Sequence, residues 1–160
     1  MSKKKGNGYG DWTKLEARLF LSPAWMSLGE KGTAPRVSSC SPQILCLLLG
    51  KRQFGWRRDG KGNKVWERTD DNRFTLTYAE LQSYGLKRDR ITRAIDELLA
   101  KGFIEILNPG GLYDKDKAIY ALRDDFRGWR RGSPPVRMRN RDVRRGFQGK
   151  KLGACSHDDN

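Results

Sequence analysis

Residues 77–106, TYAELQSYGLKRDRITRAIDELLAKGFIEI, decide the fold of this chain. The stretch predicts two short helices joined by a tight turn and followed by a strand. Thr77 and Glu80 have the spacing of a capping box, in which two side chains satisfy the free backbone donors of a first helical turn. Gly85 lets the chain reverse after the first helix. The stretch therefore predicts a helix-turn-helix that leads into a strand.

The second helix is predicted over residues 88–100. One stripe at helical spacing collects its apolar side chains, which are Ile91, Ala94, Ile95, Leu98 and Leu99. Gly102 then ends the helix at a position that favours a left-handed residue. Residues 103–107 are predicted as a strand, residues 108–111 (NPGG) as a turn and residues 117–122 as the return strand.

These residues resemble a known family. The pattern Thr77-x-x-Glu80-Leu81, Gly85-Leu86, Ile91, Ala94-Ile95, Glu97-Leu98 and Gly102-Phe103-Ile104 is similar to a winged helix-turn-helix domain of small phage, prophage and plasmid regulators and replication-associated proteins. The resemblance covers residues 74–123. It implies an α+β fold with a three-helix core and a β-hairpin wing, in which the second helix enters the major groove of DNA and the wing touches the backbone. A helical hairpin that only packs, and a winged helix that binds protein, remain alternatives.

The charge of the chain indicates a polyanionic partner. The 160 residues carry a net charge of +14, which favours nucleic acid or an anionic membrane surface. No apolar run is long enough to span a bilayer, since the longest, residues 44–49, has six residues. The lysines near the N-terminus precede no apolar segment, so we expect no secretory signal and a location in the cytoplasm or nucleoid of a host cell. Three cysteines fit a reducing compartment.

Composition divides the chain into three parts. Residues 1–21 are predicted as an N-terminal arm, residues 22–125 as the winged-helix domain with an insertion at 51–73, and residues 126–160 as an Arg-rich tail. We expect both basic extensions to be flexible. The tail carries 10 basic and 3 acidic side chains, a net charge of +7. Ser22-Pro23 and Ser41-Pro42 each predict a helix start with the serine as N-cap. Residues 43–49 would be the first helix of the core.

The insertion at 51–73 allows two interpretations, a β-hairpin with a basic tip or a mobile loop. Its three aromatic side chains are Phe54, Trp56 and Trp66. Aromatic residues between basic ones stack nucleic-acid bases and hold phosphates, but large aromatics also dominate small cores. Packing under the loop is the favoured interpretation. Residues 73–76 alternate in polarity and are predicted to pair with the wing.

Arginine reads guanine through two hydrogen bonds or binds phosphate. The predicted DNA-binding residues are Lys87, Arg88, Arg90, Thr92 and Arg93 on the second helix, Arg57, Arg58, Lys61 and Lys64 in the insertion, and Arg130, Arg131, Arg137 and Arg139 in the tail. Ala100 and Asp96 are expected on the outward face of the helix and Glu97 on its flank. Asp89–Arg93, Arg93–Glu97 and Glu97–Lys101 are expected as surface pairs, each contributing about 0.2–0.5 kcal/mol.

An enzyme is not expected. The only histidine is His157, and adjacent carboxylates such as Asp70-Asp71 and Asp124-Asp125 rarely share a site. The chain has no phosphate-binding glycine loop. Cys40, Cys46, Cys155 and His157 do not have the spacing of a zinc finger, so no metal or other cofactor is expected. Cys46 is expected in the core.

The sequence thus predicts a sequence-specific protein that binds double-stranded DNA in transcription or replication of a virus or mobile element. A palindromic target would imply a homodimer. One alternative is an architectural or RNA-binding protein that acts through its tail without base preference. The other is a winged helix that binds an acidic host protein. No membrane partner is expected.

Overall fold

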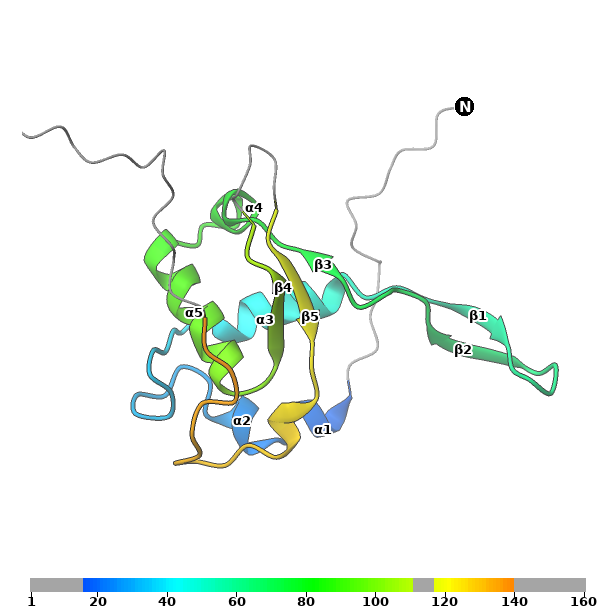
Figure 1. The fold of residues 1–160 in the computed structure, drawn as a ribbon, viewed down its shortest axis with the longest axis horizontal. Helices are drawn as coiled ribbons and strands as arrows, with labels where there is room; N and C mark the ends of the chain where they lie inside the picture. Colours follow the sequence, from blue (N-terminus) through cyan, green and yellow to red (C-terminus); the bar gives the residue numbers. More distant parts are fainter. Residues whose placement is uncertain (1–15, 111–116, 140–160) are drawn as a thin grey trace, which may run out of the picture.

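The computed structural model describes residues 16–110 and 117–139, which form an α+β fold (Figure 1). Within these residues the helices are α1 (Ala17–Phe20), α2 (Pro23–Met26), α3 (Ser41–Gly50), α4 (Tyr78–Ser83), α5 (Arg88–Ala100) and the short 3-10 helix η1 (Asp125–Arg127). The strands are β1 (Phe54–Arg58), β2 (Lys64–Arg68), β3 (Phe74–Thr75), β4 (Ile104–Asn108) and β5 (Ile119–Leu122). Among the helices described, none is both long enough and apolar enough to cross a membrane.

The core lies where α3 and α5 pack against a three-stranded sheet. The apolar stripe predicted for the second helix is confirmed, because α5 buries Ile91, Ala94, Ile95, Leu98 and Leu99. Opposite it, α3 buries Ile44, Leu45, Leu48 and Leu49. Each large aliphatic side chain buried in this way stabilises the fold by roughly 1.5–3 kcal/mol. One face of α5 is therefore fixed by the core, and the opposite side is exposed only in the first half of the helix, where Arg88, Arg90 and Arg93 lie.

The sheet behind these helices is antiparallel, with the strand order β3-β5-β4. Ile104 lies opposite Leu122 and Phe74 opposite Tyr120, and a register shift separates Ile106 from Asn108. The two strands predicted after the second helix, and the short strand predicted at 73–76, are confirmed with small changes at their ends. The acidic and basic residues 114–116 between β4 and β5 lie outside the described residues.

Three helix starts were predicted from their N-cap residues, and the structure confirms two of them. Thr77 Oγ1 accepts a hydrogen bond from the Glu80 amide at 3.1 Å, and Ser22 Oγ accepts one from the Trp25 amide at 3.2 Å. The third prediction needs a correction. The helix after Cys40 begins at Ser41 itself, whose hydroxyl is buried and donates to the Glu97 carboxylate instead of capping the helix.

Gly102 ends α5 as predicted, and the structure shows why a glycine is needed. Its φ is 78°, in the left-handed region, and the Phe103 amide donates back to the Leu98 carbonyl at 3.0 Å. A Cβ at this position would lie 2.9 Å from Asp125 Cβ and 3.0 Å from the Phe126 nitrogen. The glycine therefore both reverses the chain and admits η1 against the end of α5.

The predicted boundary between domain and tail at residue 126 is too early. Phe126 and Trp129 are buried, and the Phe126 ring stacks on Phe103 with centroids 4.8 Å apart. Val136 donates its amide to the Ala100 carbonyl at 2.8 Å, and Ala100, expected on the outward face, is buried. Two aromatic side chains in an Arg-rich segment thus extend the packed domain through residue 139. Residues 140–160 of the predicted tail, and 1–15 of the predicted arm, lie outside the described residues.

Residues 51–73 form a hairpin, which decides between the two interpretations of this insertion. Strands β1 and β2 pair antiparallel and project from the body of the protein (Figure 1). At the base, the Thr69 amide donates to the Gln53 carbonyl at 2.9 Å. At the tip, Asp59 Oδ1 accepts from the Lys61 and Asn63 amides. Phe54 and Trp66 are half-buried, whereas residues 57–65 are all exposed, so the outer part of the hairpin depends mainly on the pairing of its own strands.

Candidate nucleic-acid interface

The first half of α5 presents the cations that were predicted to contact DNA. Lys87, Arg88, Arg90 and Arg93 are all exposed, and none of them forms an ion pair within the described part of the chain. Arg88 lies over a ring of α4, with its guanidinium carbon 5.9 Å from the Tyr78 centroid. The four cations therefore form a free surface, which we call the α5 face.

Thr92, the fifth residue predicted on this helix, is half-buried. Its hydroxyl lies 3.1 Å from the Tyr78 hydroxyl and within hydrogen-bond distance of the Arg88 carbonyl. Its polar atom thus already has partners in the protein. We assign Thr92 to the packing between α4 and α5 rather than to the free surface.

The expected pairing of Arg93 with Glu97 does not form, because Glu97 is completely buried. Its Oε1 accepts from the Gly29 amide at 2.7 Å, and its Oε2 accepts from the Ser38 amide at 3.0 Å and the Ser41 hydroxyl at 2.5 Å. This carboxylate therefore ties α5 to the loop before α3. The predicted surface position of Glu97 is wrong.

Lys101 completes this buried cluster. Its ammonium lies 2.8 Å from Glu97 Oε1 and donates to the Ser27 carbonyl at 2.6 Å. It also lies 5.3 Å from the centroid of the Trp129 ring. Burial lowers the pKa of Lys101, and the hydrogen bond and charge of Glu97 oppose that change. The predicted i,i+4 pair exists, but it is an interior anchor rather than a surface contact.

Two arginines from distant parts of the chain neutralise Asp96 beside the α5 face. Arg139 Nε lies 3.0 Å from Asp96 Oδ1, and its other guanidinium nitrogens donate to the Thr92 carbonyl at 3.4 Å and the Tyr78 hydroxyl at 3.5 Å. Arg36 approaches the other Asp96 oxygen at 3.4 Å. An acidic group that would repel a phosphate is therefore already paired.

The other predicted tail arginines are engaged within the protein. Arg131 lies 2.6 Å from Glu30 and Arg137 lies 2.6 Å from Asp125. Arg130 donates to backbone carbonyls of residues 127 and 129. The described tail residues thus do not form one continuous basic surface with the α5 face.

The predicted basic residues of the hairpin are exposed but lie far from the α5 face. Arg57, Arg58, Lys61 and Lys64 all belong to the outer part of the β1–β2 hairpin. Figure 1 shows this hairpin at one end of the longest axis of the molecule and α5 towards the other end. The structure therefore separates the predicted site into two cationic regions.

The aromatic residues of the insertion behave in two ways. Phe54 and Trp66 are half-buried near the base of the hairpin, as the packing interpretation predicted. Trp56 is 67% exposed, which that interpretation did not predict. Its neighbour is Trp66, with ring centroids 5.2 Å apart in an edge arrangement. Packing under the hairpin thus accounts for two of the three rings.

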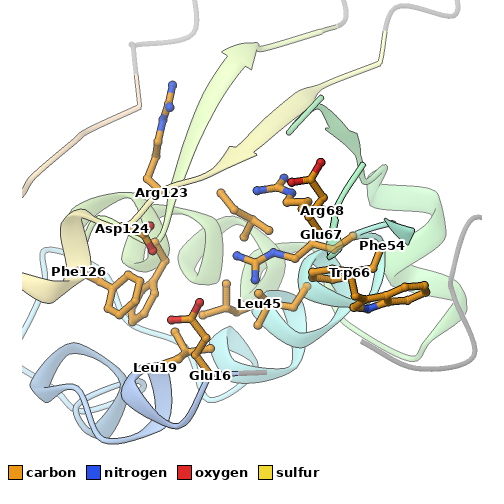
Figure 2. Close-up of a pocket in the computed structure, with 14 residues that line it drawn as sticks. Glu16, Leu19, Leu45, Phe54, Trp66, Glu67, Arg68, Arg123, Asp124 and Phe126 are labelled. Carbon is orange, nitrogen blue, oxygen red and sulfur yellow. The ribbon is translucent and has the colours of Figure 1, made fainter. Parts of the chain in front are cut away.

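A cavity of about 310 Å³ lies at the base of the hairpin, between α1, α3 and η1. Figure 2 shows Leu19, Leu45 and Phe126 on one side and Phe54 and Trp66 on the other, with charged residues at the rim. The full lining is Glu16, Leu19, Leu45, Leu49, Arg52, Phe54, Trp66, Glu67, Arg68, Phe103, Leu122, Arg123, Asp124 and Phe126.

Arg52 differs from the other arginines of this lining. Arg68 pairs with Asp70 and Arg123 with Glu105, whereas the Nε atom of Arg52 is buried without a hydrogen-bond partner in the described structure. Burial and the nearby charge of Arg68 lower the pKa of Arg52, and the neighbouring carboxylates oppose this. The cavity lining therefore combines apolar side chains with charged ones, and among them Arg52 is half-buried with an unsatisfied Nε atom.

The cysteines are placed differently from the expectation. Cys40 is buried, and its Sγ lies 3.1 Å from the Ser38 hydroxyl, while Cys46 is exposed on the outer side of α3. The predicted core position of Cys46 is therefore wrong, because the core covers only the side of α3 that carries Ile44, Leu45 and Leu48. Residues 16–110 and 117–139 contain no group of three or more potential metal ligands. Cys155 and His157 lie outside these ranges.

Sequence reasoning missed the residues that support the α5 face. Tyr78, Arg36 and the donors to Glu97 from Gly29, Ser38 and Ser41 act through contacts between residues far apart in the chain, and no local spacing indicates them. Only the Glu97–Lys101 pair has a local signal, the i,i+4 spacing. Comparison of the chain with models of protein families, with curated proteins and with solved structures found no match.

Proposed function

We propose that this protein binds double-stranded DNA as a winged helix-turn-helix protein, with the first half of α5 in the major groove. Its process would be transcription or replication of a virus or mobile element. The chain order α3, β3, α4, α5, β4, β5 and the strand order β3-β5-β4 support this proposal. In this order two helices joined by a short turn precede an antiparallel pair of strands, which agrees with the arrangement that the family resemblance implies.

The proposal depends above all on one observation, the free cations of the α5 face. Arg88, Arg90 and Arg93 lie on a helix whose inner side is fixed by the core and by buried Glu97. Arginines held on a rigid helix can reach base edges in a defined register, and bidentate contact to guanine discriminates by about 1–3 kcal/mol per base pair. The pairing of Asp96 with Arg139 and Arg36 further lowers repulsion of the DNA backbone.

The first test selects bound fragments from a random duplex library and compares two changes of equal charge. Arg90→Gln removes a cation from the α5 face, whereas Arg18→Gln removes an exposed cation from α1. We expect Arg90→Gln to reduce the preference for the selected site by roughly 5- to 150-fold. Arg18→Gln should change affinity for selected and random duplexes alike. Equal effects of the two changes, or a library without an enriched site, would contradict the proposal.

Salt dependence and truncation then separate base readout from binding by the tail. If about six phosphates are neutralised, the logarithm of affinity falls with the logarithm of salt concentration at a slope near −5. Truncation must follow Arg139, because Phe126 and Trp129 belong to the core. A protein that reads bases through α5 keeps its site preference without residues 140–160. Loss of nearly all binding in the truncated chain would favour the tail instead.

A further inference from the structure

The outer part of the hairpin has one face on which aromatic and cationic side chains alternate. In the register of the β1–β2 pair, Trp56 lies opposite Trp66 and Arg58 opposite Lys64. Directly opposed residues, and residues two apart along a strand, point to the same side of a sheet. These four side chains therefore share one face, which we call the Trp56 face. Arg57 lies on the other face, opposite Val65.

Burial against the described residues does not explain the position of Trp56. It is 67% exposed, and its contact with Trp66 is edge-on, with an interplanar angle of 65°. A cross-strand aromatic pair stabilises a hairpin, but the contact leaves most of the Trp56 side chain open to solvent. The hairpin therefore offers an indole ring to a partner.

The charges of the Trp56 face are free, whereas the neighbouring Arg57 and Asp59 have partners within the hairpin. Arg58 and Lys64 are exposed and form no ion pair with any described residue. On the opposite face, Arg57 lies 3.7 Å from Glu67. The Asp59 carboxylate accepts hydrogen bonds within the turn, from the Asn63 amide at 2.8 Å and the Asn63 side chain at 3.1 Å. An anionic partner would thus meet two unpaired cations beside an open aromatic ring.

We propose that the Trp56 face binds single-stranded nucleic acid, with Trp56 stacking on an unpaired base and Arg58 and Lys64 contacting phosphates. Stacking platforms with flanking cations bind single strands with little base preference, because every base has a π-face. Bases inside a duplex are already stacked on each other, so an aromatic side chain needs an unpaired base. This site is separate from the α5 face in both position and ligand, and it does not depend on the proposed function of α5.

The test measures the fluorescence anisotropy of a labelled oligothymidylate of about 15 nucleotides, a length that covers the usual site sizes. Trp56→Ala in the full chain should weaken its binding at least about fivefold, the lower end for loss of one stacked base. Trp56→Phe should keep most of the affinity, because it retains a ring that stacks. Both variants should bind the duplex selected for α5 within about twofold of the unchanged protein.

One matched pair of variants and one control test whether the Trp56 face, rather than the hairpin as a whole, makes the contact. Arg58→Gln should weaken binding of the oligothymidylate more than Arg57→Gln, its neighbour on the other face. Val65→Thr, also on the other face, should leave binding unchanged and serves as the control for folding of the hairpin. Equal losses for Arg57→Gln and Arg58→Gln would show that only net charge matters and would overturn the proposal.

Two further outcomes would also overturn it. One is an oligothymidylate affinity that Trp56→Ala leaves unchanged. The other concerns the oligomeric state measured by sedimentation. If the unchanged protein is a dimer, and Trp56→Ala dissociates it without changing the affinity for the oligothymidylate, then a second copy of the chain occupies the Trp56 face. Loss of duplex binding in Arg90→Gln with retained binding of the single strand would leave this inference intact, so the two proposals can fail separately.

Discussion

The α5 face and the Trp56 face carry the same kind of charge on very different supports. Behind the α5 face lie the aliphatic core and the fully buried Glu97–Lys101 pair. The residues of the outer hairpin, 57–65, are all exposed, and among the described residues its two strands contact mainly each other. An isolated two-stranded hairpin is only marginally stable in water. One region is therefore held by the whole domain, and the other by local contacts.

This difference bears on what each region can recognise. Base readout requires donors held within a fraction of an ångström, which rigid, well-supported elements provide. Stacking on an unpaired base tolerates movement, because the contact is made with a ring face and not with a fixed hydrogen-bond pattern. The α5 face is thus suited to sequence-specific contact, and the Trp56 face to a ligand of variable sequence.

The largest effect is expected from removing the anchor of α5. Glu97→Ala leaves the Lys101 ammonium buried without its carboxylate, and it removes the acceptor for Gly29, Ser38 and Ser41. Breaking a buried pair in this way costs about 3–5 kcal/mol of the free energy of unfolding. Urea denaturation followed by far-ultraviolet circular dichroism measures the loss.

The comparison variant is Trp56→Ala, which removes an exposed side chain from the hairpin. We expect it to lower the free energy of unfolding by less than about 1 kcal/mol, the value of a cross-strand pair. Similar losses for Glu97→Ala and Trp56→Ala would contradict the view that the two regions have unequal support.

Local sequence signals were sufficient for α5 itself. The spacing of Ile91, Ile95 and Leu98 gave its buried side, and Gly102 gave its end, because both signals depend only on helix geometry. The cap at Thr77 and the strands after α5 are also short-range patterns. The periodic part of the fold could therefore be predicted from the sequence.

The anchors of the fold could not be predicted in the same way. The hydrogen-bond donors to Glu97 from the start of α3 and the loop before it lie 56 to 68 residues earlier in the chain, whereas the local pattern showed only Lys101 four residues later. An i,i+4 pair looks the same in sequence whether it is exposed or buried. For the same reason Phe126 and Trp129 were placed in a tail, although they pack on the end of α5.

A smaller effect is expected at the base of the hairpin, where Arg52 borders the cavity. Its Nε atom is buried and forms no hydrogen bond with the described residues, and burial lowers its pKa. An unsatisfied buried donor costs about 1–3 kcal/mol, so Arg52→Met should raise the free energy of unfolding by about 1 kcal/mol. The increase appears as a higher urea midpoint at unchanged slope.

Arg123→Met is the matched control, since Arg123 lines the same cavity but pairs with Glu105 at 2.5 Å. This exposed pair contributes little, so we expect a change within about 0.5 kcal/mol. A loss of stability in Arg52→Met would show that attraction of the guanidinium to the neighbouring carboxylates outweighs the cost of its unsatisfied Nε atom. The Arg52 guanidinium at the base of the hairpin would then stabilise the fold, as the buried Glu97–Lys101 pair does at α5, and the contrast between the two sites would disappear.

The smallest effect is a pH dependence at the junction between the hairpin and the main sheet. Asp70 accepts hydrogen bonds from the Gln53 and Asn72 amides and from Arg68, and Asn72 in turn bonds to the backbone of Leu122. Burial raises the pKa of Asp70, but hydrogen bonds from Arg68, Gln53 and Asn72 outweigh burial and leave it lowered. This carboxylate therefore links the base of β1–β2 to β5 only while it is ionised.

The sign of the effect follows from the lowered pKa. The stabilisation by Asp70 is complete above the ordinary aspartate pKa of about 4 and is lost as the pH falls through the lower value of the folded protein. Amide exchange of β1 and β2 should therefore accelerate relative to that of α5 when the pH is lowered through this range. Because exchange chemistry itself depends on pH, the ratio of protection factors is the quantity to compare.

Asp70→Asn should remove this pH dependence, and its persistence in that variant would assign the loosening to another carboxylate. If the amides of α5 and of the hairpin instead lose protection from exchange together, the two regions unfold as one unit. The hairpin would then be as stable against local opening as α5, although its residues are less buried.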